Sequence, residues 1–241
     1  MYVGSSVFPY TSSTIFWTNY KLTNDVEEKL NDGYIYEGSS DLELGDNQKQ
    51  IVGIRFNLPV PKYATIDNAF IQFTVDEDKN YDPVNFTIKS ELADNSSKFT
   101  LNNYDLSNRA KSFSEVLWNN IPQWVNEGEA GVYQKTPDIS SIIQEVVNQP
   151  SWNQNNAITF FIEGTGTRTA ISFEKDQSQS PKLLIQFNGN NTETEVKLQE
   201  TNLPLVINVD DENLSVLNSN STALVRCVRS NDPNNSHQSY S

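Results

Sequence analysis

Apolar and polar residues alternate along several segments of the chain, and this period of two predicts half-buried β-strands. Clusters of Asp, Asn, Ser and Pro separate these segments, as in antiparallel sheets whose strands are joined by turns. In the first segment Leu42 and Leu44 fall on one face, which we expect to be buried. The predicted strands span 33–44, 50–61, 64–77, 84–92, 158–166, 170–174 and 181–187. Because no repeated helices separate them, the pattern favours an all-β, antiparallel fold.

One segment has helical periodicity instead. In residues 136–147 the apolar side chains recur every three to four positions and form one stripe, made of Ile139, Ile142, Ile143, Val146 and Val147. Thr136 suits the N-cap, Pro137 suits the first helical position, and Pro150 ends the helix. The sequence therefore predicts one short helix near 137–148.

Composition and charge narrow the range of partners. The chain has 241 residues, of which 36% are hydrophobic, with 12 Phe, 10 Tyr and 4 Trp, enough for one large β domain with its own core. The net charge of −14 argues against a nucleic-acid partner and against an anionic membrane, because both attract clustered Lys and Arg. No apolar run approaches the roughly 18 residues of a membrane span, so no membrane insertion is expected. The one cysteine, Cys227, cannot form an intramolecular disulfide.

The pattern of strands and turns predicts three parts. Residues 31–188 are expected to form one β-sandwich domain, and residues 1–30 a leader with room for one strand. Residues 189–241 are expected to be a linker and a partly disordered C-terminal extension. The first residues have neither a basic start nor a continuous apolar stretch, so they do not resemble a signal peptide. We expect the chain to be a segment of a longer protein with further domains.

Several motifs follow one another in the order found in a known family. The segment SEVLWNNIPQW (114–124) contains a strand ending in Trp-Asn-Asn-Xaa-Pro, and it is followed by the predicted helix and two apolar strands. Upstream, Arg55 lies between apolar residues in GIRF, and ATIDNAFIQF (64–73) forms the next strand. A tryptophan after the helix, Trp152, and the Ser-Phe-Glu of 172–174 complete the set.

This order resembles the DNRLRE-type domain, a jelly-roll module similar to carbohydrate-binding modules, and the likeness covers about residues 31–188. The resemblance implies an antiparallel β-sandwich (jelly roll) with one short helix on a secreted or cell-surface microbial protein. It also implies a non-catalytic module that binds an extracellular polysaccharide. A structural or adhesive surface domain without sugar binding is the alternative.

The residue inventory argues against an enzyme. The one histidine, His237, lies in the predicted tail, so neither a Ser-His-Asp nor a Cys-His site can be assembled within the domain. A pair of carboxylates of the glycosidase type remains conceivable, but 31 acidic residues produce such pairs by chance. We therefore expect binding and no reaction.

Four residues are candidates for contact with a glycan. Trp124 follows Pro122 in a polar context and is predicted to be a loop platform for a sugar ring, with a core position as the alternative. Asn119 and Asn120 could orient the sugar hydroxyls beside it. Arg55 could bind a uronate carboxylate, although an acidic side chain of the protein is the competing partner.

A structural calcium ion is a further expectation. The loop 76–82 offers hard oxygen ligands at alternate positions, and two carboxylates of an earlier strand lie on one face. The candidate ligands are Asp76, Asp78, Asn80, Asp82, Asp41 and Glu43. The loop lacks the glycine and the final glutamate of an EF-hand, and a hydrated hairpin loop is the alternative interpretation.

Overall fold

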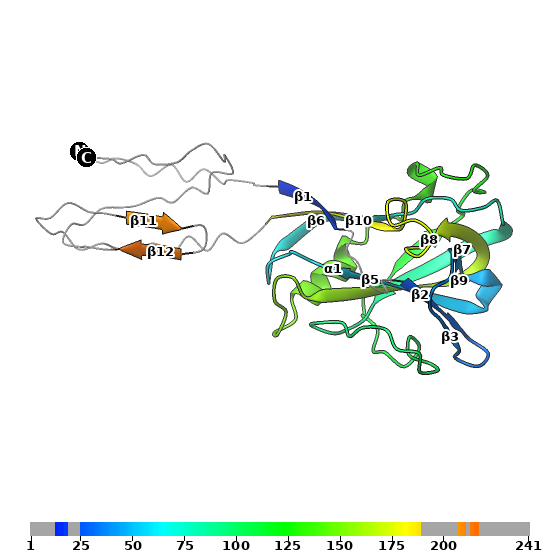
Figure 1. Ribbon diagram of the computed structural model, residues 1–241, viewed down its shortest axis with the longest axis horizontal. Helices are drawn as coiled ribbons and strands as arrows, with labels where there is room; N and C mark the ends of the chain where they lie inside the picture. Colours follow the sequence, from blue (N-terminus) through cyan, green and yellow to red (C-terminus); the bar gives the residue numbers. More distant parts are fainter. Residues whose placement is uncertain (1–12, 19–24, 189–206, 211–212, 217–241) are drawn as a thin grey trace, which may run out of the picture. The chain divides into compact units, whose positions relative to one another are not determined.

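The computed structural model describes residues 13–18, 25–188, 207–210 and 213–216 (Figure 1). Most of this part of the chain is β-structure. The larger sheet contains β2 (Asp25–Lys29), β3 (Ile35–Tyr36), β4 (Asp41–Leu44), β5 (Gln50–Asn57), β7 (Tyr81–Ser90), β8 (Val116–Asn119) and β9 (Ala157–Ile171). The smaller sheet contains β1 (Ser13–Thr18), β6 (Thr65–Gln72) and β10 (Lys182–Asn188).

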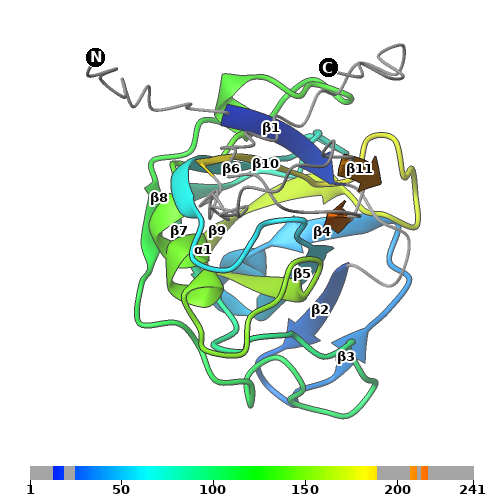
Figure 2. The same ribbon diagram turned by 90° about the vertical axis from the view of Figure 1, so that its left-hand side faces the viewer.

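All pairings between these strands are antiparallel. The larger sheet has the order β3-β2-β5-β9-β7-β8, and β4 pairs with β9 beside this path. The smaller sheet has the order β1-β10-β6, and Figure 2 shows these three strands side by side. A separate unit, residues 191–241, contains the hairpin of β11 (Ile207–Asp210) and β12 (Asn213–Val216). The prediction of mainly antiparallel β-structure with one short helix is confirmed.

The short helix is α1 (Ser140–Val147), and two single 3-10 turns, η1 (Asp46–Gln48) and η2 (Val132–Gln134), accompany it. The five residues of the predicted apolar stripe are all buried. The helix begins later than predicted because the backbone before it is already bonded to β6. Thr136 donates its N–H to the Ile71 carbonyl at 3.0 Å, and Ile139 donates to Ala69 at 2.8 Å. Among the described residues, no helix is long and apolar enough to cross a membrane.

The main core collects side chains from both sheets and from the helix. Val52 and Ile54 of β5, Phe86 of β7 and Phe160 of β9 share it with Ile185 of β10. Leu42 and Leu44 are also buried in this core, as their spacing predicts. On every second position, the strands of the larger sheet place side chains on the opposite face, which we call the outer face.

The segment 93–112 covers one half of the outer face. There it closes over a second, smaller core that includes Val26, Ile51 and Phe161, with Leu106 from the segment itself. The buried carboxylate of Glu28 accepts hydrogen bonds from the backbone N–H groups of residues 106 and 107, at 2.6 and 3.2 Å. The segment 93–112 does not cover the other half of the outer face, which lies over β7 and the middle of β9.

The domain begins earlier in the sequence than the predicted boundary near Asn31. β2 starts at Asp25 and pairs with β5 and β3, and β1 pairs with β10. β2 was not predicted as a strand because its sequence, Asp25-Val26-Glu27-Glu28, has acidic residues at positions where apolar ones are expected. The rest of the predicted leader and most of the predicted extension lie outside the described residues.

β9 spans two segments that were predicted to be separate strands. It is 15 residues long. Its first part lies between β5 and β7, which pair with residues 157–162 and 160–167, and its last residues, 168–171, pair with β4. At its middle, Gly164 has a φ of 148° and approaches β7 so closely that a Cβ atom would lie 2.1 Å from the Asn85 carbonyl oxygen. Because only glycine fits this contact, β9 can pair closely with β7 at this point.

We expect Gly164→Ala to destabilise the domain by roughly 1–3 kcal/mol, because the added methyl group must push β7 and β9 apart. Gly38→Ala is the matched control, since Gly38 also has a positive φ of 85° but no atom within 4 Å of the position of a Cβ. Denaturant unfolding of both variants measures the difference. Equal losses of stability would mean that backbone strain alone matters and that the contact between the strands does not.

Candidate functional site

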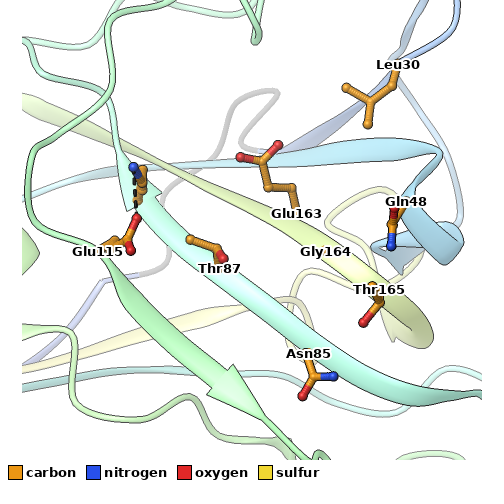
Figure 3. A pocket seen from close by; sticks show the side chains of 9 residues that line it. Leu30, Gln48, Asn85, Thr87, Glu115, Glu163, Gly164 and Thr165 are labelled. Carbon is orange, nitrogen blue, oxygen red and sulfur yellow. Dashed lines mark ion pairs between the residues drawn. The ribbon is translucent and has the colours of Figure 1, made fainter.

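The uncovered half of the outer face forms an open groove of about 620 Å³ (Figure 3). Most of the lining comes from β7 and β9, which are adjacent in the larger sheet. Polar side chains from these strands dominate the lining, and residues from the β2–β3 turn and η1 close one end. The lining consists of Leu30, Gln48, Asn85, Thr87, Lys89, Glu115, Glu163, Gly164 and Thr165.

Strand alternation and register bring these side chains together. On β7, Phe86 and Ile88 point into the main core, so Asn85, Thr87 and Lys89 point outward. Asn85 lies opposite Thr165, and Thr87 opposite Glu163. Directly paired residues on one face of a sheet lie about 5 Å apart, so each pair can contact the same small ligand.

The groove lining contains both basic and acidic side chains. The Lys89 ammonium forms an ion pair with Glu115 at 3.0 Å. Glu163 is half-buried; burial lowers the pKa of Lys111, which lies outside the lining, and the negative charge of Glu163 acts to raise it. The groove can therefore accept hydrogen bonds from a ligand at Glu163, and it can both donate and accept at the hydroxyl of Thr87 and the amide of Asn85.

Two of the predicted ligand residues lie at the end of this groove. Asn119 is exposed and lies directly opposite Asn85 in the pairing of β8 with β7. Asn120 is also exposed, with a φ of 55°, and its N–H donates to the Asn85 Oδ1 at 3.3 Å. The structure thus brings Asn119 and Asn120 next to the groove.

Trp124 requires a correction. It has no exposed surface and packs against Phe73 and Trp118, with ring centroids 6.3 and 6.2 Å away. Its indole Nε1 donates to the Tyr133 carbonyl at 3.1 Å, which satisfies its one polar atom. A buried indole cannot stack on a sugar, so the predicted platform at Trp124 is wrong and the core interpretation is right. Trp152 is also buried.

Arg55 does not belong to the groove. Its Nε and Nη2 both donate to the Ser96 carbonyl, at 3.2 and 2.9 Å. Arg55 lies opposite Thr159 on β9, four residues from Glu163, the nearest groove residue of that strand, which is roughly 13 Å along a strand. Burial, and then the charge of Arg109, lowers the pKa of Arg55. Its contacts anchor the segment 93–112.

The predicted calcium ligands of the 76–82 loop do not converge. Asp76 forms an ion pair with Lys175, and Asp82 forms one with Arg168 at 2.6 Å. Asn80 is bonded through its side chain to both the N–H and the carbonyl of Trp124, at 2.9 and 2.8 Å. Asp78 is exposed.

The two remaining calcium candidates are also engaged by protein groups. Glu43 pairs with Lys79, and Asp41 accepts a hydrogen bond from the Ser39 hydroxyl at 3.0 Å. Among the residues that the structure describes, no group of three His, Cys, Asp or Glu side chains could hold a metal ion. Because lysine, arginine and backbone groups take up these oxygens, the set does not fit calcium.

Two buried carboxylates on β2 were not singled out from the sequence. Glu27 accepts hydrogen bonds at Oε1 from the Glu43 N–H and the Gln50 Nε2, at 2.7 and 2.8 Å. Burial raises the pKa of Glu27 to about 7, with a smaller contribution from the charge of Asp41. For Asp25, burial and then the charge of Glu174 raise the pKa well above its usual range.

Comparisons with known proteins do not assign this chain. No family model matches it, and no curated protein matches it either.

We expect Trp124→Ala to destabilise the domain by roughly 3–5 kcal/mol, because it empties a buried site in the main core. Tyr133→Ala is a suitable control: the Tyr133 side chain is largely exposed, and its backbone carbonyl, which accepts the indole bond, remains. Denaturant unfolding of the two variants measures the difference in their stability. A Trp124→Ala variant as stable as the native protein would contradict the core position.

The stability of the domain should fall as pH rises from 5 to 8. The pKa of Glu27 is raised in the folded state, so its contribution is complete below about pH 4.5 and is lost as pH passes through about 7. The loss amounts to as much as roughly 3 kcal/mol. Glu27→Gln should reduce this slope while preserving an acceptor for Gln50. Melting temperatures measured across this range test it, and an unchanged slope in Glu27→Gln would refute the assignment.

Proposed function

We propose that this chain is a non-catalytic polysaccharide-binding module of a secreted or cell-surface protein. Its proposed fold is an antiparallel β-sandwich of the jelly-roll kind, resembling the DNRLRE-type domain. The support for a sandwich is that inward side chains of β6 and β10 share one core with those of β5, β7 and β9. The support for glycan binding is the groove on the outer face.

The polar groove is the observation that carries the proposal. A polysaccharide is a chain of hydroxyl groups, each of which both donates and accepts hydrogen bonds. On its paired strands the groove offers matching groups in fixed positions, namely the hydroxyls of Thr87 and Thr165, the amide of Asn85 and the charges of Lys89 and Glu163. The amide of Gln48, from η1, adds a further donor and acceptor. The open shape suits an extended chain better than a compact small molecule.

The proposed interaction is weak. An open groove buries only part of its ligand, and its lining contains no aromatic ring for stacking. We therefore expect a dissociation constant in the micromolar range or above, which corresponds to about −8 kcal/mol at best. Attachment to further domains of a longer parent protein would raise the effective affinity through multivalency.

A structural or adhesive surface domain is the second candidate. The observation that favours it is a set of large apolar side chains exposed on this polar molecule: Phe113 is 87% exposed, Val132 69% and Leu101 66%. Such residues could contact other copies or other proteins. This candidate predicts self-association in solution and no retention by any glycan.

We expect Thr87→Phe to abolish retention by glycans, because the ring fills the middle of the groove. A β-strand tolerates phenylalanine at a half-exposed position, so the melting temperature should change little. Thr65→Phe is the matched control, since Thr65 is an exposed strand residue of β6, in the other sheet. Affinity gels with cellulose, xylan, chitin, chitosan and alginate provide the measurement.

Retention of Thr87→Phe equal to that of the native protein would exclude the groove as the binding site. If the native protein binds none of these glycans and forms oligomers, the structural or adhesive candidate replaces the proposal.

A further inference from the structure

We infer that Phe113 is an aromatic subsite beside the groove, against which one pyranose ring of a neutral polysaccharide stacks. This inference rests on the proposed glycan-binding function and adds a contact residue outside the groove lining and the kind of sugar that it takes. It depends on the exposure of the ring, on the hydrogen bonds that fix its backbone and on its place in the chain.

The Phe113 ring is available to a ligand. Among the described residues it is the most exposed of the large apolar side chains, at 87%. An exposed ring forgoes the burial through which phenylalanine usually stabilises a fold. The ring can therefore be changed with little effect on folding, and it can be covered by a partner.

Hydrogen bonds to two other elements fix the backbone that carries this ring. The carboxylate of Glu145, on α1, accepts from the N–H groups of Phe113 and Ser114, at 2.9 and 2.8 Å. The preceding Ser112 donates its N–H to the carbonyl of Ser90, the last residue of β7, at 2.8 Å. The Ser112 hydroxyl accepts from the Ser90 N–H at 3.0 Å. The ring is thus presented by a fixed turn, which limits the entropy lost when a ligand binds.

Phe113 lies beside the groove, close to the start of β8. Glu115, two residues further along the chain, lines the groove and forms the ion pair with Lys89. Two residues of fully extended chain span at most about 7 Å, so the backbone of Phe113 lies no further than that from the backbone of the lining. A sugar chain that leaves the groove past Glu115 can therefore contact the ring.

A neutral pyranose supplies the complementary chemistry. When its hydroxyls are equatorial, as in the units of cellulose and xylan, the faces of the sugar ring present C–H groups. These groups carry a small positive charge, and they meet the negative face of the phenyl ring. A uronate also brings a carboxylate, which is repelled by a chain with a net charge of −14.

A protein partner fits this surface less well. The residues on either side of Phe113 are Lys111, Ser112, Ser114 and Glu115, so the ring is a single apolar group in a polar segment. The buried centre of a stable protein interface is a larger and mostly apolar patch. Stacking of one sugar unit needs only one ring.

The test measures the affinity for soluble cellohexaose and xylohexaose by titration followed by amide chemical shifts. We expect Phe113→Ala to bind them roughly tenfold more weakly, because the aromatic contact is lost. Phe113→Leu keeps an apolar side chain without an aromatic face and should lose nearly as much. Phe113→Trp should bind at least as tightly as the native protein.

Tyr133→Ala is the matched control, since Tyr133 is also a largely exposed aromatic residue but lies in η2, outside the groove lining. We expect it to bind both hexaoses as the native protein does. Equal losses in Tyr133→Ala and Phe113→Ala would show that exposed rings act without regard to their position, and would overturn the inference. Melting curves establish that all variants are folded.

The remaining outcomes separate this inference from the proposed function. If Thr87→Phe abolishes binding while Phe113→Ala binds as the native protein does, the inference is wrong and the groove remains the glycan site. The inference is also wrong if the native protein binds another glycan but neither hexaose, or if Phe113→Ala breaks up an oligomer without changing glycan binding. If no glycan binds at all, the proposed function is wrong, and the inference fails with it.

Discussion

The guanidinium of Arg168 has no exposed surface, and its hydrogen bonds hold together the ends of three segments that form the groove side of the molecule. From β9 it donates to Asp82 at the start of β7, at 2.6 Å, and to the carbonyls of Ile121 and Pro122 just after β8. A buried cation is tolerated only when its donors are satisfied, so these segments cannot move apart without exposing an unpaired charge. The same contact lowers the pKa of Asp82, because the hydrogen bond from Arg168 stabilises its charged carboxylate.

This anchorage explains why a polar surface can have a fixed shape. The groove lies on strands that face the packed main core on one side, and Gly164 lets β7 and β9 approach closely beneath it. At the opposite edge of the sheet, the segment 93–112 is fixed by the buried carboxylate of Glu28. The outward side chains are therefore presented by rigid backbone, which limits the entropy lost when a ligand binds.

The sequence predicted those features that depend on neighbours along the chain. The alternation around Leu42 and Leu44 and the stripe from Ile139 to Val147 both reflect local periodicity, and both are buried as expected. The predictions from the sequence were wrong where contacts with residues distant along the chain determine the position of a side chain. The Trp124 ring is buried because it packs against Phe73 of a distant segment and its indole N–H donates to the Tyr133 carbonyl. The acidic 76–82 loop is neutralised by Lys175 and Arg168, about a hundred residues away. The groove itself depends on the register of β7 against β9, which no single segment of the sequence determines. Of the ligand residues predicted from the sequence, only Asn119 and Asn120 therefore lie next to it.

The central claim is that the outer face of β7 and β9 binds a glycan. Titration of the isotope-labelled protein with soluble oligosaccharides of the glycans used in the affinity gels, followed by amide chemical shifts, tests this claim most directly. We expect saturable shifts at residues 85–89 and 163–165, with little change in the loop 76–80, which does not line the groove. Shifts confined to other surfaces, or no saturable shift with any of these oligosaccharides, would contradict it.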